Sequence, residues 1–563
     1  MLRKTNALEE TGYDLVVIGG GITGACIACD AAVRGMSVAL VEKGDFGAAT
    51  SSASSKLLHG GIRYLQKGRL LKLRESALER AYFQTLAPHL CHYVPFVVPA
   101  YGGLKKGKLL LGLGLGVYEA LCLGQNKNIS DPAKQVPKGQ LLSKADVREY
   151  VPEAYRQEVT GGILLYESHM RDSERMTLSF LKTAAEHGAA VANYTRAEAF
   201  QVEGNRVTGI RVSDLLDGST MEIRSSMVIN AAGPWIPSNI DKLDSRANPR
   251  TVTGLAKGAH IVTKPLTDGH AMALPIREQN EALLNRGGRH VFIIPWQGHS
   301  LIGTTYSAFE GDPDDVTADE SDVRELMQII NAAFGSEVLT RREVVHAYAG
   351  LYPLTAEQVK PEVYQGTDDY QVVDHEQTDQ VEGFVSAFGA KFTTARRLAE
   401  KAVTLVAGKL QGDFSECRTH QMRLAGGEIN DIKAYRERKK QQYQAILSAE
   451  VVDHLVSRYG TKIDSVANIL EEEPELNATL SPGSNTLAAE VVYTARNEMA
   501  CRLEDVVFRR SNLGLLGHSE MSSLRRCAEL MARERGWDNQ RIEQEIQETE
   551  EKFLDNAVQS AKD

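Results

Sequence analysis

Residues 13–44, YDLVVIGGGITGACIACDAAVRGMSVALVEKG, limit the fold of this chain more than any other stretch. The continuous apolar run at 15–18 predicts a strand that is buried on both faces. A glycine-rich turn follows, then a predicted helix over 25–34 that ends at Gly35, a common residue just past a helix. A second strand over 37–41 ends at Glu42. This pattern predicts a βαβ unit and therefore an α/β fold with a parallel sheet.

The glycines of this unit, Gly19, Gly21 and Gly24, have the spacing of a dinucleotide-binding turn. The motif alone is weak evidence, but here it lies between a buried strand and a helix, and Glu42 follows 18 residues after the last glycine. The glycines permit a tight turn, a close approach of the backbone to a pyrophosphate, and close packing of helix on strand. The helix N-terminus favours phosphate, and Glu42 can accept hydrogen bonds from ribose hydroxyls. We predict nucleotide binding.

The next stretch favours FAD over a nicotinamide cofactor. Residues 44–61 form a long loop of small and hydroxyl-bearing residues, and the segment TSSASSKLLHGGIRY at 50–64 is too polar for a buried helix or strand. Such a loop can run along an extended cofactor and offer N–H and O–H donors to its pyrophosphate and ribityl oxygens. Two more segments fit the same cofactor: VINAAGPW at 228–235 and FGAKFTTARRLAE at 388–400, whose helix dipole can face the flavin ring.

We expect the following residues to contact FAD: Gly19, Gly21, Gly24, Glu42, Thr50, Ser51, Ser52, Ser54, Ser55, His59, Gly60, Ala232, Gly233, Gly389, Lys391 and Thr393. His59 is expected to pack beside the ring. No metal ion is expected.

Composition limits the partners of this 563-residue chain. Its formal net charge of -10 argues against a broad basic surface, so no nucleic-acid partner is expected. The seven cysteines are scattered, which indicates a reducing compartment, and Cys26 and Cys29 are interpreted as packing residues rather than a redox pair. The first 14 residues lack the apolar segment of a secretory signal. Residues 105–123, KKGKLLLGLGLGVYEALCL, are too short to span a bilayer and indicate either a surface-dipping helix or a buried core helix.

Other segments predict the remaining elements. Residues 70–92 have the periodicity of an amphipathic helix. Short alternating segments over 191–230, and a strand-rich stretch over 258–305, predict antiparallel strands. Strand precedes helix again over 384–406, and the chain beyond about 415 is expected to be helical and charged.

In combination, these segments resemble the FAD-dependent glycerol-3-phosphate dehydrogenases, of the D-amino-acid-oxidase-like flavoprotein superfamily. The resemblance rests on SSASSKLLHGG, INAAGPW, KGAHIV, IIPWQGHSLIGTT and FGAKFTTARRLAE, and on EMACRLEDVVFRRSNLGL at 498–515. It covers nearly the whole chain. It implies a Rossmann-type FAD-binding domain interleaved with an antiparallel-sheet substrate domain, followed by an all-α C-terminal domain.

The expected division of the chain assigns 1–90, 151–235 and 356–410 to the FAD-binding domain. It assigns 91–150 to the substrate domain or a membrane-proximal insertion, 236–355 to the substrate-binding sheet and 411–563 to the helical cap.

The resemblance also implies an activity, the oxidation of sn-glycerol 3-phosphate to dihydroxyacetone phosphate by hydride transfer to the flavin. Electrons would pass to a membrane quinone, or to oxygen as in the oxidase branch of the family; the quinone is favoured, so we expect a cytoplasmic protein peripheral to the inner face of the membrane. The sequence leaves an oligomer open.

Three residues are expected to carry the chemistry. Arginine binds phosphate with a planar fork, and the resemblance assigns Arg63 to the substrate. His260, in KGAHIV, could take the alcohol proton as a neutral imidazole. Lys391 could stabilise the reduced flavin or bind substrate. The alternatives are a surface role for Arg63 and a core role for His260. Arg175 matches an arginine of the family pattern, and a structural role is equally consistent with it.

One position departs from the family pattern. In YAGLYPL, at 348–354, the family has a substrate-binding arginine where this chain has Tyr352. Tyrosine offers one hydrogen bond and no charge, so phosphate binding should weaken by about 1.5–3 kcal/mol unless another cation replaces the arginine. Candidates for that cation are Arg277, Arg286 and Arg289. Two alternatives therefore stay open: the same flavin chemistry on another small hydroxy acid or polyol phosphate, and a non-catalytic flavin-binding sensor.

Overall fold

The glycine-rich unit forms the centre of a parallel sheet, as predicted. Strand β1 (Tyr13–Ile18), helix α2 (Ile22–Val33) and strand β2 (Val38–Val41) follow one another along the chain. β1 pairs in parallel with β2 on one side and with β10 (Thr220–Asn230) on the other. The strand order is β17-β18-β10-β1-β2-β7, with bounds Gln371–Asp374, Phe384–Phe388 and Ala190–Ala192 for β17, β18 and β7. Only β17 runs antiparallel to its neighbour along this path.

The computed structural model describes residues 12–66, 68–101, 106–152, 156, 159–243, 252–275, 290–354, 370–482, 484–517 and 520–556, with Met1, Arg3, Thr5, Leu8 and Glu9. At 63, 66, 101, 106–111 and 554–556 it describes the backbone alone.

Both faces of the parallel sheet are covered, which explains the uninterrupted apolar run of β1. Leu15 and Val17 pack in one core with α2, α7 (Ser173–Glu186) and α11 (Ala395–Leu410). Val16 and Ile18 point into a second core on the opposite face. That core contains side chains of an antiparallel ribbon, formed by β8 (Thr195–Glu203), β9 (Arg206–Asp214) and the first half of β10, and of helix α8 (Ile236–Asp241).

A second, mixed sheet of ten strands has the order β15-β11-β14-β13-β12-β4-β6-β3, with β16 on β11 and β5 on β6. All its described pairs are antiparallel except β12 with β4. The bounds are β3 Leu57–Leu58, β4 Cys91–Tyr101, β5 Gln140–Leu142, β6 Val159–Met170, β11 Gly254–Thr263, β12 Ala271–Pro275, β13 His290–Trp296, β14 His299–Gly303, β15 Ser307–Phe309 and β16 Val344–Leu354.

Alternation along the strands gives this second sheet two different faces. Ala259 and Ile261 belong to a core that is covered by α6 (Lys144–Tyr150) and α9 (Glu320–Phe334). His260 and Val262 point to the other face, because successive side chains of a strand alternate. That face is directed toward the loop that follows β2.

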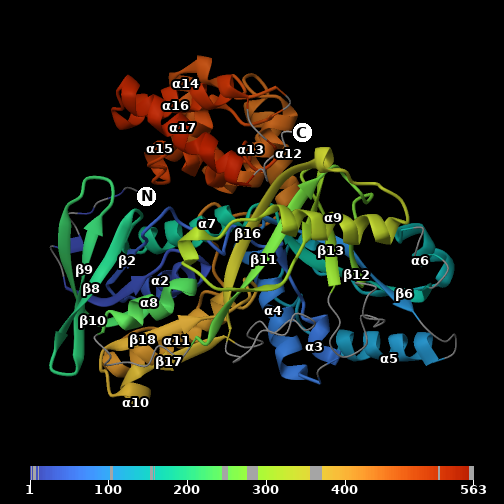
Figure 1. Cartoon of the computed structure of the whole chain (residues 1–563), viewed down its shortest axis with the longest axis horizontal. Coiled ribbons are helices and arrows are strands. Elements are labelled where there is room, and N and C mark those ends of the chain that lie inside the picture. Colours follow the sequence, from blue (N-terminus) through green and yellow to red (C-terminus); the bar gives the residue numbers. More distant parts are fainter. Residues whose placement is uncertain are drawn as a thin grey trace.

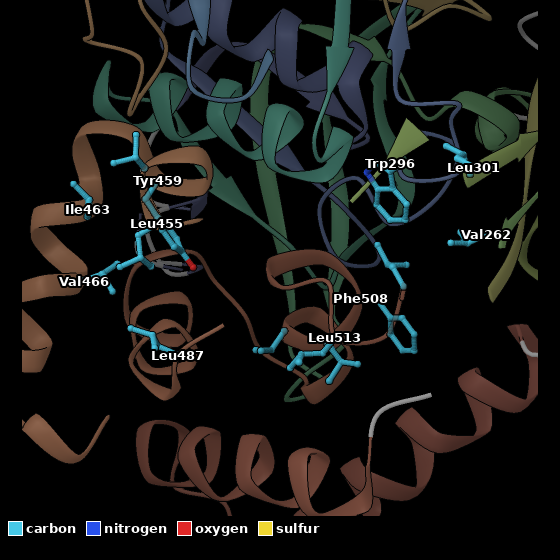
Figure 2. Close-up of a cluster of buried hydrophobic side chains, with 14 of the residues drawn as sticks. Val262, Trp296, Leu301, Leu455, Tyr459, Ile463, Val466, Leu487, Phe508 and Leu513 are labelled. Carbon is cyan, nitrogen blue, oxygen red and sulfur yellow. The ribbon is translucent and has the colours of Figure 1, made fainter. Parts of the chain in front are cut away.

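The C-terminal helices gather at one end of the molecule, on the side opposite α3 (Ile62–Gln66) and α5 (Lys106–Leu121) (Figure 1). Figure 2 shows the core that joins them to the second sheet, where Trp296 and Val262 lie near Phe508 and Leu513. The helices are α12 Ile432–Tyr443, α13 Ala449–Tyr459, α14 Ile463–Glu472, α15 Ala488–Asn497, the π-helical turn Asp505–Arg510, α16 Met521–Arg535 and α17 Asn539–Asn556.

The helix expected over 70–92 is shorter than predicted. Helix α4 spans Leu70–Leu86, and strand β4 begins at Cys91. Pro88 accounts for the early end, because a proline disfavours helical geometry at the residue before it. Residues 91 and 92, whose periodicity extended the helix, instead pair with β6.

Helix α5 lies inside the segment 105–123 that was interpreted as either surface-dipping or buried. The buried interpretation is wrong for one side of this helix: Leu113 and Val117 are 61% and 42% exposed, although Tyr118 is buried. Within the described residues, no helix is long and apolar enough to cross a membrane.

The boundaries of the interleaved domains stay a prediction, but the sheets show where individual strands belong. β6, inside the segment 151–235, pairs along its length with β4 of the segment 91–150, and both lie in the mixed sheet. β3, inside 1–90, also pairs with β6. Pairing between strands that are far apart in sequence produces this mixture, which periodicity does not reveal.

Gly460 offers a test of how the helical part is attached. It has a left-handed φ of 54°, and an added Cβ would lie 1.8 Å from the carbonyl oxygen of Gly426. We expect Gly460→Ala to lower the free energy of unfolding by about 2–4 kcal/mol, from backbone strain and steric overlap. Gly408→Ala in α11 is the matched control, because its Cβ would meet nothing within 4 Å. Equal denaturation midpoints for the two variants in urea would contradict this prediction.

Candidate active site

The glycine turn between β1 and α2 forms a cradle without side chains. Gly19 has a left-handed φ of 109°, and an added Cβ there would lie 2.7 Å from the carbonyl oxygen of Ala231. A Cβ on Gly24 would lie 1.9 Å from the carbonyl oxygen of Gly19, so the helix packs directly on the turn. Gly21 is extended and precedes the first residue of α2. The turn at this helix N-terminus is therefore free of side chains, and the positive end of the helix dipole favours a pyrophosphate there.

Glu42 lies beside this turn at the end of β2. Its carboxylate accepts hydrogen bonds from the backbone N–H of Gly20 (2.6 Å) and of Gly44 (2.8 Å). Burial raises the pKa of Glu42, and these two N–H groups oppose the rise. A carboxylate has more lone pairs than two donors use, so Glu42 keeps acceptor capacity for ribose hydroxyls.

The serine-rich loop connects the two sheets. The hydroxyl of Ser51 accepts a hydrogen bond from the N–H of Ile22 at the start of α2 (2.9 Å). Thr50 donates to the carbonyl oxygen of Leu351 in β16 (2.5 Å), and the carbonyl oxygen of Ser54 accepts from the hydroxyl of Tyr348 (2.8 Å). The loop thus spans from the nucleotide turn to the mixed sheet, as a cofactor-lining segment must.

The side-chain contacts described for the remaining serines of this loop are local. Ser52 donates to the carbonyl oxygens of Ala48 and Ala49. Ser55 is half-buried.

The end of this loop meets the junction between β18 and α11. The N–H of His59 donates to the hydroxyl of Thr393 (3.0 Å), and the Lys391 amine donates to the hydroxyl of Tyr64. Gly389 lies at the end of β18 against Tyr370. The two segments expected to flank the flavin, 50–64 and 388–400, are therefore side by side.

Two other residues expected in the site, Arg63 and Gly60, lie close in sequence to His59 and Tyr64. The backbone of Arg63 lies in α3, next to Tyr64, while its side chain is outside the description. Gly60 donates its N–H to the carboxylate of Glu167 in β6 (2.6 Å), and a Cβ there would overlap Arg80.

His260 faces this region from the mixed sheet. Strand register aligns it with Gly303 on one side and Tyr348 on the other, and aligns Gly303 in turn with Phe292. The rings of His260 and Tyr348 are stacked, with centroids 5.2 Å apart, and the ring of Phe292 lies 5.7 Å from that of His59. The face of the mixed sheet that carries His260 and Phe292 therefore contacts the serine-rich loop that carries His59.

The surroundings of His260 keep its imidazole neutral. Burial, followed by the charge of Lys56, lowers the pKa of His260 to about 3. Its Nδ1 is buried and has no hydrogen-bond partner among the described residues. Lys56 is itself buried and paired with Glu174 (2.8 Å). A neutral imidazole with a free nitrogen can accept a proton, so the structure supplies the protonation state that the chemistry requires.

Tyr352 lies on the same face as His260, four residues after Tyr348 in β16. It stacks with Tyr306 (centroids 6.1 Å apart), and its ring lies near Gly258. Ala232 and Gly233 follow β10 beside the nucleotide turn, and the short helix Gly233–Trp235 packs against β16. The three arginines considered as substitutes for a cation at 352, Arg277, Arg286 and Arg289, lie outside the described residues.

Sequence analysis missed two features of the site. Tyr348 stacks on His260 and binds the serine-rich loop. Its spacing of four residues from Tyr352 in one strand places both side chains on the same face, so the sequence could have predicted that Tyr348 faces the site. The Lys56–Glu174 pair carried no signal, because Glu174 is distant in sequence. For Arg175, the sequence left open a role from the family pattern and a structural role. Two of its nitrogens donate to Glu498 of the C-terminal part (2.9 and 3.0 Å), and this contact is structural.

Comparisons with known proteins agree with this geometry. The family described as FAD dependent oxidoreductase matches residues 14–405, and the family described as C-terminal domain of alpha-glycerophosphate oxidase matches residues 417–542. The chain is 30% identical over 566 residues to a glycerol-3-phosphate dehydrogenase of Synechocystis sp., covering 99% of each chain. It is 32% identical to the aerobic glycerol-3-phosphate dehydrogenase of Staphylococcus haemolyticus, covering 90% of this chain and 87% of that one.

A solved structure is similar over the same length. The glycerol-3-phosphate dehydrogenase from Bacillus halodurans, complexed with FAD, superposes with a TM-score of 0.76 at 26% identity and covers 98% of this chain and 96% of that chain.

The close contact at Gly24 provides a test of the nucleotide site. We expect Gly24→Ala to lower FAD affinity at least about tenfold, because the new Cβ pushes α2 away from the turn that holds the pyrophosphate. The ratio of flavin to protein absorbance after purification, followed by FAD titration of the apoprotein, measures this loss. Gly112→Ala in α5, whose Cβ would meet nothing within 4 Å, should bind FAD as the unmodified protein does. Full flavin occupancy in Gly24→Ala would contradict the assignment.

Proposed function

The chain belongs to the family of FAD-dependent oxidoreductases, and on that premise we propose that it oxidises sn-glycerol 3-phosphate to dihydroxyacetone phosphate. The observation that carries the proposal is the position of a neutral, buried His260, which stacks on Tyr348. Tyr348 binds the serine-rich loop at Ser54, and the same loop binds the α11 junction through His59. Similarity to glycerol-3-phosphate dehydrogenases over 99% of the chain supports the substrate.

The glycine turn fits FAD, because it carries no side chains and can stay this tight only with glycine: a Cβ at Gly19 or Gly24 would collide with the backbone carbonyl oxygens of Ala231 or Gly19. Bound FAD supplies the acceptor for the two electrons that leave the substrate alcohol carbon. The proposed contacts of this cofactor are the sixteen residues named from the sequence, with Glu42 for the ribose and the segments at 50–60 and 389–393 for the pyrophosphate and ring.

His260 is the proposed base. It accepts the hydroxyl proton as the alcohol becomes a ketone, a role that contributes about 10²–10⁴ in rate for a positioned side chain. Its pKa near 3 keeps it neutral in the absence of ligand. A phosphate dianion brought nearby would raise that pKa, since an opposite charge favours the protonated imidazole. Substrate binding would thus strengthen the base at the moment it is needed.

Lys391 and Arg63 are the proposed cations for the substrate. The Lys391 amine contacts Tyr64, which directly follows Arg63 in α3, so the backbone of Arg63 is adjacent to the residue that Lys391 contacts. Two positive charges there suit a dianion, and Arg63 contributes the planar fork that binds two phosphate oxygens at once.

Tyr352 supports a second candidate, the same chemistry on another small hydroxy acid or polyol phosphate. Its ring lies on the face of His260 and stacks on Tyr306, so an uncharged aromatic pair stands where the family pattern has a cation. A substrate with a smaller anionic charge would suit that pair better. The third candidate, a flavin sensor without turnover, is less consistent with a base and two cations retained in one region.

We further propose that electrons pass to a membrane quinone and that the face formed by α3, α5 and the start of α4 lies on the membrane. Five of the ten large apolar side chains that are exposed among the described residues lie there: Leu70, Leu71, Leu113, Val117 and Leu123. Arg74 joins α4 to the end of α5 by donating to the carbonyl oxygens of Leu121 and Leu123. This apolar face suits shallow insertion of a monotopic protein.

Anaerobic addition of glycerol 3-phosphate tests the substrate. We expect rapid loss of flavin absorbance near about 450 nm in the unmodified protein, and a rate lower by about 10²–10⁴ in His260→Asn, because the base is removed. FAD content of that variant should be unchanged. Bleaching by other hydroxy acids but not by glycerol 3-phosphate would favour the second candidate, and a protein that stays oxidised with all of them would favour the sensor.

The membrane proposal has a separate test. The double variant Leu71→Glu, Leu113→Glu should bind anionic phospholipid vesicles at least about tenfold more weakly, because two charges replace exposed apolar surface. Quinone reduction in those vesicles should fall with it, while reduction of a soluble dye acceptor stays unchanged. Leu215→Glu, Leu216→Glu, at a turn after β9, changes two exposed leucines outside this face and is the control. Equal vesicle binding by all three proteins would contradict the proposal.

A further inference from the structure

A short loop after β2 contacts the glycine turn at Gly20. The N–H of Gly20 donates to Glu42 (2.6 Å), and the N–H of Gly47 donates to the carbonyl oxygen of Gly20 (3.1 Å). Phe46 packs so closely on Gly20 that an added Cβ there would lie 2.7 Å from its ring. Residues 42–47, named here the clamp loop, therefore set the position of the turn that receives the pyrophosphate.

The clamp loop contains a buried carboxylate, Asp45, which binds the C-terminal part of the chain. It accepts hydrogen bonds from Arg509 Nε (2.7 Å) and from two nitrogens of Arg510 (2.7 and 2.8 Å). Asn193 adds a fourth hydrogen bond (3.1 Å). The side chain of Asp45 has no exposed surface, and that of Arg510 is 1% exposed. The contact is thus a desolvated, multiply bonded ion pair between the cofactor-binding part and the C-terminal helices.

Both arginines also make hydrogen bonds within the C-terminal part of the chain. They end the π-helical turn Asp505–Arg510, where Arg509 also pairs with Asp505 (2.6 Å) and Arg510 donates to the carbonyl oxygen of Glu498 (3.0 Å). Tyr194 links the groups again: its hydroxyl donates to Asp505 (2.6 Å), and its N–H donates to the carbonyl oxygen of Gly44 in the clamp loop (2.9 Å). The arginines therefore present a fixed pair of charges to Asp45.

Electrostatics agrees with the geometry. Burial alone would raise the pKa of Asp45, but Arg510 and Arg509 outweigh it and hold that pKa below its ordinary value. Asp45 is therefore ionised, and loss of an arginine would leave a charge without compensation in a buried site. Such a charge is strongly unfavourable, so the clamp loop would move to solvate it. Glu42 and Phe46 would then move away from Gly20.

We propose that Arg509 and Arg510 are positioning residues for FAD: acting through Asp45, they fix the clamp loop on the glycine turn. The C-terminal helical part then sets how tightly the adenosine and pyrophosphate half of the cofactor is held. By linkage, FAD binding stabilises the attachment of the helices by the same factor. This role concerns cofactor retention and is independent of which alcohol is oxidised.

The rate of FAD release from the holoenzyme tests this role. After dilution into buffer, release is followed by the rise of flavin fluorescence, and melting temperatures are measured in parallel. Arg510→Lys and Asp45→Asn should release FAD at least about tenfold faster than the unmodified protein. Arg510→Met should release it faster than Arg510→Lys, since lysine keeps the charge but loses the two-nitrogen fork.

Arg175→Lys is the matched control. Arg175 forms a buried, two-nitrogen pair with Glu498 at the same junction and, among the described contacts, touches no residue of the clamp loop. We expect it to lower the melting temperature to a similar extent but to release FAD within about twofold of the unmodified rate. Unchanged release in both Arg510→Lys and Asp45→Asn would overturn the proposal. Equally fast release in Arg175→Lys would also overturn it, because loosening of the junction alone would then explain the effect. If Arg510→Met does not fold, the two conservative variants still decide.

Discussion

The attachment of one polar loop to two sheets is the constraint on which the rest of this structure depends. Residues 50–60 are bound to the start of α2 through Ser51, to β16 through Thr50 and Ser54, and to the α11 junction through His59. None of these partners is close in sequence to the loop. The parallel sheet supplies the nucleotide turn and the mixed sheet supplies His260, so the loop links the nucleotide turn to the sheet face that carries His260.

Burial determines the chemistry that this site can perform. A histidine in a sheet interior loses hydration, and the neighbouring charge of Lys56 lowers its pKa further. The same lysine also acts on His346, whose pKa falls to about 4 through burial and that charge. The fold thus keeps both imidazoles neutral, and the neutral form is the one that can accept a proton from an alcohol.

The molecule separates its tasks in space. The apolar face of α3, α4 and α5 lies on the side opposite the C-terminal helices (Figure 1). Those helices attach through a continuous core, to which Trp296 and Phe508 contribute, and through buried ion pairs at Asp45 and Glu498 (Figure 2).

The sequence by itself determined the βαβ unit, its glycine turn, the antiparallel ribbon of β8–β10 and the helical C-terminal part, because each follows from local periodicity and turn chemistry. It also pointed to the segments that meet at the flavin site, through a family pattern carried by short motifs. It did not determine the early end of α4 or the membership of β3 and β6 in the mixed sheet. Nor did it reveal the partners of Tyr348, Arg175 and Asp45. Tyr348 and Ser54 are 294 positions apart, Arg175 and Glu498 are 323 apart, and Asp45 and Arg510 are 465 apart. Only the packed chain decides such pairs, because a buried charge or hydroxyl is stable only where tertiary structure brings its partner within hydrogen-bond distance.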